Sequence, residues 1–243
     1  MRYRIYIGAL CLLLASVVHA QLPSHLNTAA HCAYMKPTER EMIAEINLLR
    51  HNPAAYIKFL QPLLTAAQSA LRKNGQGRKS YALTHTTTVV NGRKTVQTDT
   101  TWNFINEEEV KALQSLIKDL KRCKKLPILQ PDSGIYLAVQ HFAVDQNQHE
   151  WNLSHTGSDG SQPWDRIRKY SPRMRTGNEN IAGKFPQPTP REVVILLLID
   201  SGIPGYGHRY NLLNPQWTHI ACLDGGLQGS MYRWLQNFGA INR

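Results

Sequence analysis

Four short polar segments contain side chains that readily exchange protons or bind metal ions. In chain order they are SHTGSDG (154–160), PWDRI (163–167), GNENIA (177–182) and GHR (207–209). Each segment supplies one titratable side chain, and these are His155, Asp165, Glu179 and His208. Small residues and glycines beside most of them would leave room for a bound molecule. We therefore treat the four side chains as one candidate site.

Two imidazoles and two carboxylates can build three kinds of site. Neutral imidazoles can bind zinc or another divalent metal, with carboxylates as further ligands or as groups that orient the rings. The same four groups can hold a water molecule and act as general base and general acid. They can also form a buried hydrogen-bonded network that only fixes the loops together. The residue types alone leave all three open.

Familiar catalytic motifs are absent from the chain. His149 and His155 are six residues apart, so on a helix they would face nearly opposite sides, unlike the two histidines of a zinc protease. No Gly-x-Ser-x-Gly sequence occurs, which excludes the usual nucleophile elbow. The lack of a nucleophile motif favours a binding protein over a hydrolase.

Taken in order, the four segments resemble the motifs of the CAP superfamily. This superfamily includes cysteine-rich secretory proteins, venom antigens and plant pathogenesis-related proteins. The stretches SHTGSDGSQPWDRI, GNENIAG and GHRYNLLNPQWTHIAC are most similar to its bacterial secreted branch. The resemblance covers about residues 38–240, and residues 75–105 look like an insertion.

The resemblance implies an α-β-α sandwich with a central cleft lined by two histidines and two acidic residues. Matched motif by motif, the histidines are His155 and His208, and one acid is Glu179. The second acid falls on Asp165, where the family usually has glutamate, so this carboxylate is retracted by one methylene. The metal-binding interpretation assigns His155 and His208 as the ligands of zinc or another divalent ion.

Two functions follow from the resemblance. The first is a binding module for lipid, for anionic cell-wall glycan or for another protein, with the cleft as the binding site. The alternative is a hydrolase that uses the same cleft for metal-assisted or acid/base chemistry. The sequence does not decide between them.

Residues 1–20 have the layout of a secretory signal peptide. Arg2 and Arg4 precede an apolar run, and small residues lead to Ala20. We expect cleavage after Ala20 and a secreted or periplasmic protein. The apolar run is short for a membrane span and no second one follows, so we expect no transmembrane anchor in the mature chain.

The chain is strongly basic, with a formal net charge of +11. Loss of Arg2 and Arg4 with the signal segment would lower this charge to +9. A positive protein favours anionic partners such as acidic glycans, cell-wall polymers or phospholipid head groups. Because export removes the protein from nucleic acid, we expect no nucleic-acid partner.

Apolar periodicity and capping signals predict the helices. A capping box at Thr38–Glu41 predicts a helix over 39–50, and Asn52-Pro53 opens a second helix that Pro62 should bend or end. Further helices are predicted at 107–122, 133–146 and 190–200.

Two β-hairpins are predicted. One pairs 218–223 with 231–238 across a glycine-containing turn, and the other spans 80–102 and turns at Asn91-Gly92. A hairpin at the second position could shape access to the cleft. Helices flanking antiparallel strands define an α+β fold with a central antiparallel sheet.

The chain therefore divides into a signal peptide (1–20), an N-terminal segment (21–37) and one domain (38–243) with the hairpin insertion near 75–105. The mature chain keeps Cys32, Cys123 and Cys222. An oxidising compartment permits one disulfide among these three, and its pairing does not follow from sequence.

Overall fold

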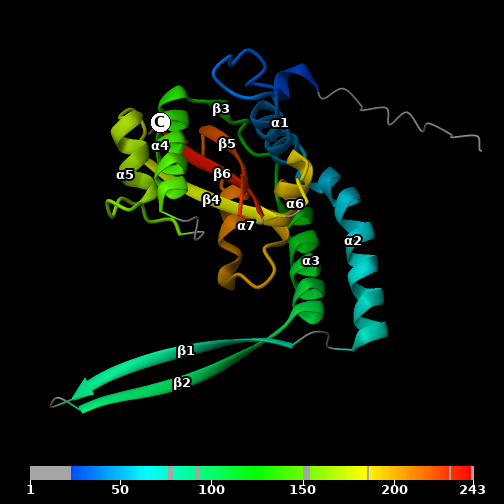
Figure 1. Ribbon diagram of the computed structural model, residues 1–243. Helices are drawn as coiled ribbons and strands as arrows, with labels where there is room; N and C mark the ends of the chain where they lie inside the picture. The colour runs from blue at the N-terminus through cyan, green and yellow to red at the C-terminus, as the bar shows by residue number, and fades with distance from the viewer. Residues whose placement is uncertain are drawn as a thin grey trace, which may run out of the picture.

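The computed structural model describes residues 23–75, 79–90, 93–149, 154–184, 186–229 and 231–241. The predicted signal peptide and its cleavage site lie outside these residues. Two layers of helices enclose a sheet, and a long hairpin extends away from them (Figure 1).

The helices and strands of the described residues run as follows. The helical elements are η1 (Ser24–Leu26), α1 (Pro37–His51), α2 (Pro53–Asn74), α3 (Ile105–Arg122), α4 (Ser133–Gln148), α5 (Pro163–Tyr170), α6 (Pro190–Ile199), η2 (Pro204–Tyr206) and α7 (Gly207–Leu213). The strands are β1 (Lys79–Val90), β2 (Arg93–Phe104), β3 (Gln130–Pro131), β4 (Thr176–Lys184), β5 (His219–Gln228) and β6 (Met231–Ala240).

The central sheet has the strand order β3-β5-β6-β4. The predicted pairing of β5 with β6 is confirmed, and both β5 and β4 run antiparallel to β6. The two-residue β3 adds a parallel ladder to β5, so the sheet is mixed rather than purely antiparallel. The predicted α+β class is confirmed, and β4 forms one edge of the sheet.

Helices cover both faces of this sheet (Figure 1). On one face, Gly177 and Gly239 have no side chains, which lets β4 and β6 approach Ile167 of α5 and Ile135 of α4. On the other face, Gln236 of β6 donates a hydrogen bond to the sulfur of Met42 in α1. The predicted α-β-α sandwich is therefore the observed arrangement.

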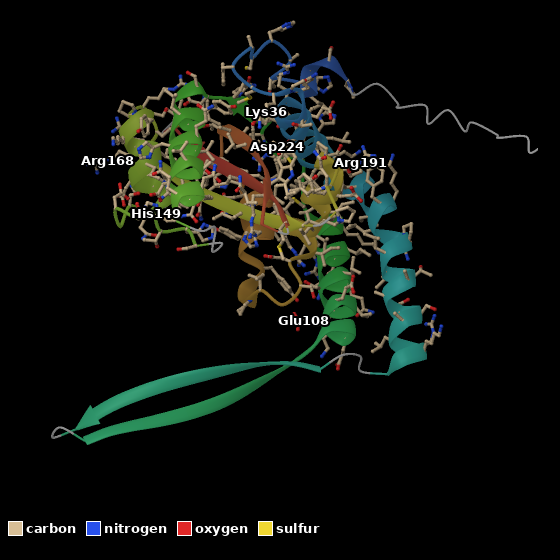
Figure 2. All side chains as sticks on the ribbon, in the orientation of Figure 1. Lys36, Glu108, His149, Arg168, Arg191 and Asp224 are labelled. Atoms are coloured by element: carbon tan, nitrogen blue, oxygen red, sulfur yellow. The ribbon has the colours of Figure 1, made fainter. Side chains whose placement is uncertain are left out.

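Helix α1 begins two residues earlier than predicted. The backbone N–H of Lys36 donates to the carboxylate of Glu39 at 2.7 Å, so Glu39 closes the first turn that starts at Pro37. The Thr38 hydroxyl instead donates to the carboxylate of Asp224. Figure 2 shows Lys36 beside Asp224, and the Lys36 ammonium donates to the Asp224 carbonyl at 2.8 Å. The start of α1 is thus tied to β5.

Helix α2 continues through Pro62, so of the two expected effects of this proline, a bend or an end of the helix, the end does not occur. The carboxamide of Asn52 caps the helix by accepting the N–H of Ala55 at 3.1 Å. Pro62 lies on an exposed side of the helix, where water can solvate the carbonyl group that the proline ring leaves without a partner.

Strands β1 and β2 form the predicted hairpin. Val90 lies opposite Arg93, which leaves a two-residue connection, and the expected turn residues Asn91-Gly92 lie outside the described part of the chain. The hairpin points away from the sheet, and its main contact with the body is at α3 (Figure 1). It therefore does not cover the sheet edge at β4.

The described residues also bear on the expectations about disulfides and membrane-spanning helices. Cys32, Cys123 and Cys222 are free thiols, and Cys222 is buried in β5. No helix in the described ranges combines the length and apolar character that a bilayer span requires.

Candidate functional site

Most of the predicted site residues line one cavity of about 440 Å³. It lies at the edge strand β4, which contributes Asn178, Glu179 and Ile181. His155 comes from the loop before α5, and His208 comes from the first turn of α7. We call this cavity the cleft.

His155 is held by a hydrogen bond to a buried carboxylate. Its Nδ1 lies 3.0 Å from Oε1 of Glu179, a residue that is only 2% exposed. The guanidinium of Arg166 lies 3.3 Å from both carboxylate oxygens of Glu179 and donates to the His155 carbonyl at 3.0 Å. Arg166 therefore offsets the buried negative charge and fixes the backbone that carries His155.

The loop that carries His155 is anchored a second time at α4. The hydroxyl and the backbone N–H of Ser158 both donate to the carboxylate of Asp145. These hydrogen bonds lower the pKa of Asp145 below its ordinary value, with the Ser158 hydroxyl as the largest cause. Asp145 thus stays ionised and holds the loop against the helix.

His208 is oriented by Asp200, a residue that the sequence interpretation missed. Oδ1 of Asp200 lies 2.6 Å from Nδ1 of His208, and Oδ2 accepts the His208 backbone N–H at 2.9 Å. Asp200 is 4% exposed and adopts the left-handed conformation (φ 53°) just after α6. The only available signal was a carboxylate at the end of an apolar helix, eight residues before the histidine.

Asp165 lies elsewhere than expected. Its carboxylate accepts the backbone N–H of Gln162 at 2.9 Å and caps the first turn of α5. It is not among the residues that line the cleft. Asp200 does not line the cleft either, but it is the carboxylate that contacts His208, whereas Asp165 serves as a helix cap.

A chain of buried amides connects the two sides of the cleft. Asn211 of α7 donates to the side chain of Asn180 at 2.8 Å and to the Glu179 carbonyl at 3.3 Å. Asn180 donates in turn to the His208 carbonyl at 3.3 Å and to Gln236 at 3.1 Å. These hydrogen bonds hold α7 against β4 and therefore set how His208 lies relative to His155.

The hydrogen bonds at the two rings determine which nitrogen can bind a ligand. A carboxylate at Nδ1 keeps the proton of a neutral imidazole on that nitrogen, which leaves the lone pair on Nε2. This is the arrangement of histidines that bind metals, whose other ring nitrogen donates to a carboxylate. Within the described ranges, no group of three or more His, Cys, Asp or Glu side chains could hold a metal. If His155 and His208 bound a zinc ion, its remaining positions would belong to water or a bound molecule.

The fold and the cleft together define a class of protein: an α-β-α sandwich with two carboxylate-paired histidines at the edge of its sheet. The model of the cysteine-rich secretory protein (CAP) family matches residues 114–238. This match covers just over half of the chain, and the chain belongs to the CAP family.

One curated relative and two solved structures are similar to this chain. The uncharacterized protein YkwD of Bacillus subtilis (strain 168) is 30% identical over 110 residues, which cover 45% of this chain and 38% of YkwD. The chain therefore spans well under half the length of that relative.

The two solved structures are more distant. An outer surface protein from Borrelia burgdorferi has 22% identity and a TM-score of 0.41, and the match covers 56% of this chain and 95% of the other. An extracellular protein containing a SCP domain from Bacillus anthracis str. Ames has 16% identity and a TM-score of 0.37. That match covers 72% of this chain and 71% of the other.

Proposed function

We propose that the protein is an exported binding module whose cleft takes one divalent metal ion, of the zinc type, and an anionic cell-wall glycan. The observation that carries this proposal is the pairing of each cleft imidazole with its own buried carboxylate. His155 pairs with Glu179 and His208 with Asp200, in both cases through Nδ1. Both rings line the same cavity.

His155 and His208 would hold the metal through Nε2. The bound ion would supply a positive centre that attracts an oxygen ligand. Glu179 and Asp200 orient the rings and keep each neutral imidazole in the tautomer that binds. Arg166 prevents the buried Glu179 from carrying an uncompensated charge.

The other groups of the cleft suit a ligand that carries hydroxyl groups. Asn178 lines this cavity, and a carboxamide can both donate hydrogen bonds to ligand hydroxyl groups and accept them. The basic charge of the chain favours an anionic polymer over a neutral one.

Binding is better supported than hydrolysis. A hydrolase would need a nucleophile or a carboxylate free to activate water. Glu179 already accepts hydrogen bonds from Arg166 and faces His155, and Asp200 is bonded twice to His208. Both carboxylates therefore act on the imidazoles.

Calorimetric titration of the mature chain with zinc tests the metal site. We expect one ion per chain in the wild type and a large loss of affinity in His155→Ala and in His208→Ala. His141→Ala is the matched control, because His141 is exposed on α4 and lies outside the cleft. Acidic buffer should weaken binding, since a protonated imidazole has no lone pair to donate. Equal zinc affinity in all four proteins would remove the metal from the proposal.

A sedimentation assay with purified anionic cell-wall polysaccharide tests the ligand. We expect the wild type to bind the polymer with zinc present, and to bind it more weakly after treatment with a chelator. His208→Ala should behave like the chelated wild type. Binding that persists unchanged in all three conditions would place the glycan outside the cleft.

A further inference from the structure

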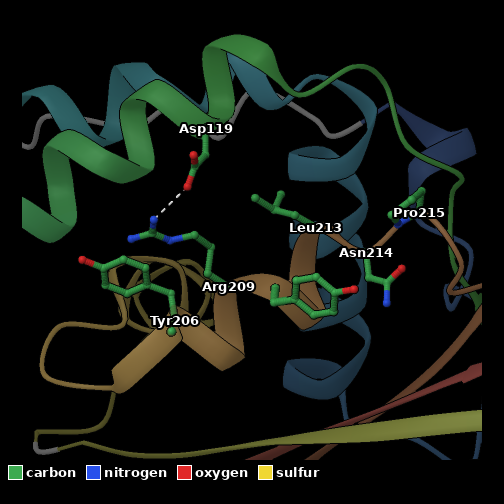
Figure 3. Close-up of a pocket in the computed structure, with 8 residues that line it drawn as sticks. Asp119, Tyr206, Arg209, Leu213, Asn214 and Pro215 are labelled. Atoms are coloured by element: carbon green, nitrogen blue, oxygen red, sulfur yellow. Dashed lines mark hydrogen bonds and ion pairs between the residues drawn. The ribbon is translucent and has the colours of Figure 1, made fainter.

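Figure 3 shows a second cavity, which lies on the other side of α7 from the cleft. It has a volume of about 230 Å³ and is bounded by α3, by η2 and by the end of α7. His208 and Asn211 of α7 line the cleft, whereas Arg209 and Tyr210 line this second cavity. One short helix thus separates two hollows, and the second is independent of the metal ligands.

Tyr206, which forms one wall of this cavity, has a strained backbone conformation. Tyr206 has φ 54° and ψ 50°, the left-handed conformation, and stands between Gly205 and Gly207. A bulky residue in this region is an outlier that persists only where surrounding contacts hold it. The guanidinium of Arg209 packs against the Tyr206 ring at 4.0 Å from its centre, which fixes the position of the ring.

Arg209 itself is unavailable to a ligand, because each of its five N–H groups already has an acceptor. Nη1 donates to Ser115 at 2.7 Å. It also donates to Asp119 at 2.9 Å (Figure 3). Nε and Nη2 donate to three backbone carbonyls, those of Leu198, Ala112 and Ile199. The Arg209 guanidinium has no free N–H group and offsets the charge of Asp119. The cavity therefore favours neither an anion nor a cation as its ligand.

The groups of this cavity that remain free to contact a ligand are hydrogen-bond acceptors and the faces of aromatic rings. The Asp119 side chain is 48% exposed, and one of its oxygens has no hydrogen bond from a described residue. Tyr210 is 68% exposed and presents its ring at the rim. These groups suit an uncharged ring that packs an apolar face on tyrosine and donates from its hydroxyls.

The size of the cavity limits the ligand to about one ring. Sites for drug-sized ligands are usually about 300–1,000 Å³, and this cavity is smaller. A proline ring of a peptide would also fit tyrosine faces, but it has no hydroxyl to donate to Asp119. Desolvating that carboxylate oxygen without a donor would weaken binding. A sugar ring satisfies both the aromatic and the polar groups.

We propose that the cavity between α3 and α7 is a subsite for one neutral pyranose ring of a polysaccharide. Tyr206 and Tyr210 pack against the ring, and Asp119 accepts a hydrogen bond from one of its hydroxyls. The subsite does not require the metal or the cleft.

Saturation-transfer NMR tests the subsite with three neutral trisaccharides, built from glucose, N-acetylglucosamine and mannose. We expect transfer to at least one of them in the wild-type protein. Tyr210→Ala should weaken its binding about three- to tenfold, the effect of losing one aromatic contact. Tyr210→Phe keeps the ring and should bind within about twofold of the wild type. Because Tyr210 is largely exposed, both variants should fold, and thermal unfolding checks this.

His155→Ala separates this subsite from the cleft, and we expect it to bind the sugar as the wild type does. Sugar binding lost in His155→Ala but kept in Tyr210→Ala would place the sugar in the cleft and overturn the subsite. No transfer to any of the three sugars would overturn it as well. A proline-rich peptide that binds in a Tyr210-dependent way while the sugars do not would assign the cavity to a peptide and also refute the proposal.

Discussion

At the scale of single residues, the cleft depends on charges that are buried in pairs. Arg166 is 3% exposed, packs its guanidinium over the ring of Phe142 at 3.7 Å and faces Glu179. The guanidinium of Arg166 therefore places an opposite charge against the buried carboxylate of Glu179. Asp200 instead makes two hydrogen bonds to one residue, His208.

Asp200→Asn should lower zinc affinity by about 10–100-fold, the usual effect of changing the partner of a metal-binding histidine. Asparagine tolerates the left-handed conformation at this position, so the backbone should be kept. It replaces a charged acceptor with a neutral amide, which weakens the bond that sets the His208 tautomer. Calorimetric titration measures the loss.

The matched control for this change is Asp165→Asn. Asp165 caps α5 and does not line the cleft, so zinc affinity should stay at the wild-type value. If the two variants lose equal affinity, the assignment of Asp200 in place of Asp165 is wrong.

At the scale of elements, a buried arginine joins α1 to the end of α7 and to the segment before β3. Arg50 has no exposed surface and donates to the carbonyls of Pro127, Leu212 and Asn214 at 2.9–3.0 Å. Burial lowers the pKa of Arg50 to about 10, so the guanidinium stays charged at neutral pH. Since α7 carries His208, this contact also supports the cleft.

Arg50→Met should lower the free energy of unfolding by about 3 kcal/mol or more, because methionine fills much of the volume but leaves several buried carbonyls without donors, at roughly 1–3 kcal/mol each. Chemical denaturation of the mature chain measures the change. Arg168→Met is the control, because Arg168 is exposed at the outer surface of α5 (Figure 2) and should change stability by less than about 0.5 kcal/mol. Similar losses in both variants would contradict the role of Arg50.

At the scale of the whole molecule, the two hollows lie on either side of one helix, while the long hairpin extends away from the body (Figure 1). If both proposals hold, a basic protein with two adjacent hollows would hold a polymer at more than one point. Linked weak contacts of this kind raise the overall affinity because the second contact is intramolecular.

Export should remove the first twenty residues. Protein recovered from outside the cytoplasm should begin at Gln21, because small residues that end at Ala20 follow the apolar run. Intact-mass analysis measures the start of the chain, and protein recovered from the cytoplasm before export is the comparison. Exported material that retains Met1 would contradict the prediction.

Local patterns in the sequence determined most of the helices and one hairpin of the sheet. In α1, for example, Met42, Ile43, Ile46 and Leu49 recur at helical spacing, and all four are fully buried. The strand β4 escaped prediction because its sequence TGNENIAGK is polar and rich in glycine, a composition with low strand propensity. It becomes a strand because β6 pairs with it and because Gly177 lets α5 approach closely.

The sequence by itself also predicted one site for His155, Glu179 and His208, since their segments carry polar groups that a core does not need, and the three residues line one cavity. Only the tertiary structure decided between Asp165 and Asp200 as the second acid. Each carboxylate ends or begins a helix, and the eight residues between Asp200 and His208 do not show whether the chain turns back to bring the two side chains together. The left-handed turn at Asp200 folds its carboxylate back onto α7, whereas the first turn of α5 uses the carboxylate of Asp165 for its own N–H group. Which carboxylate pairs with His208 depends on where two helix ends meet in space, and the spacing of residues along the chain does not give that position.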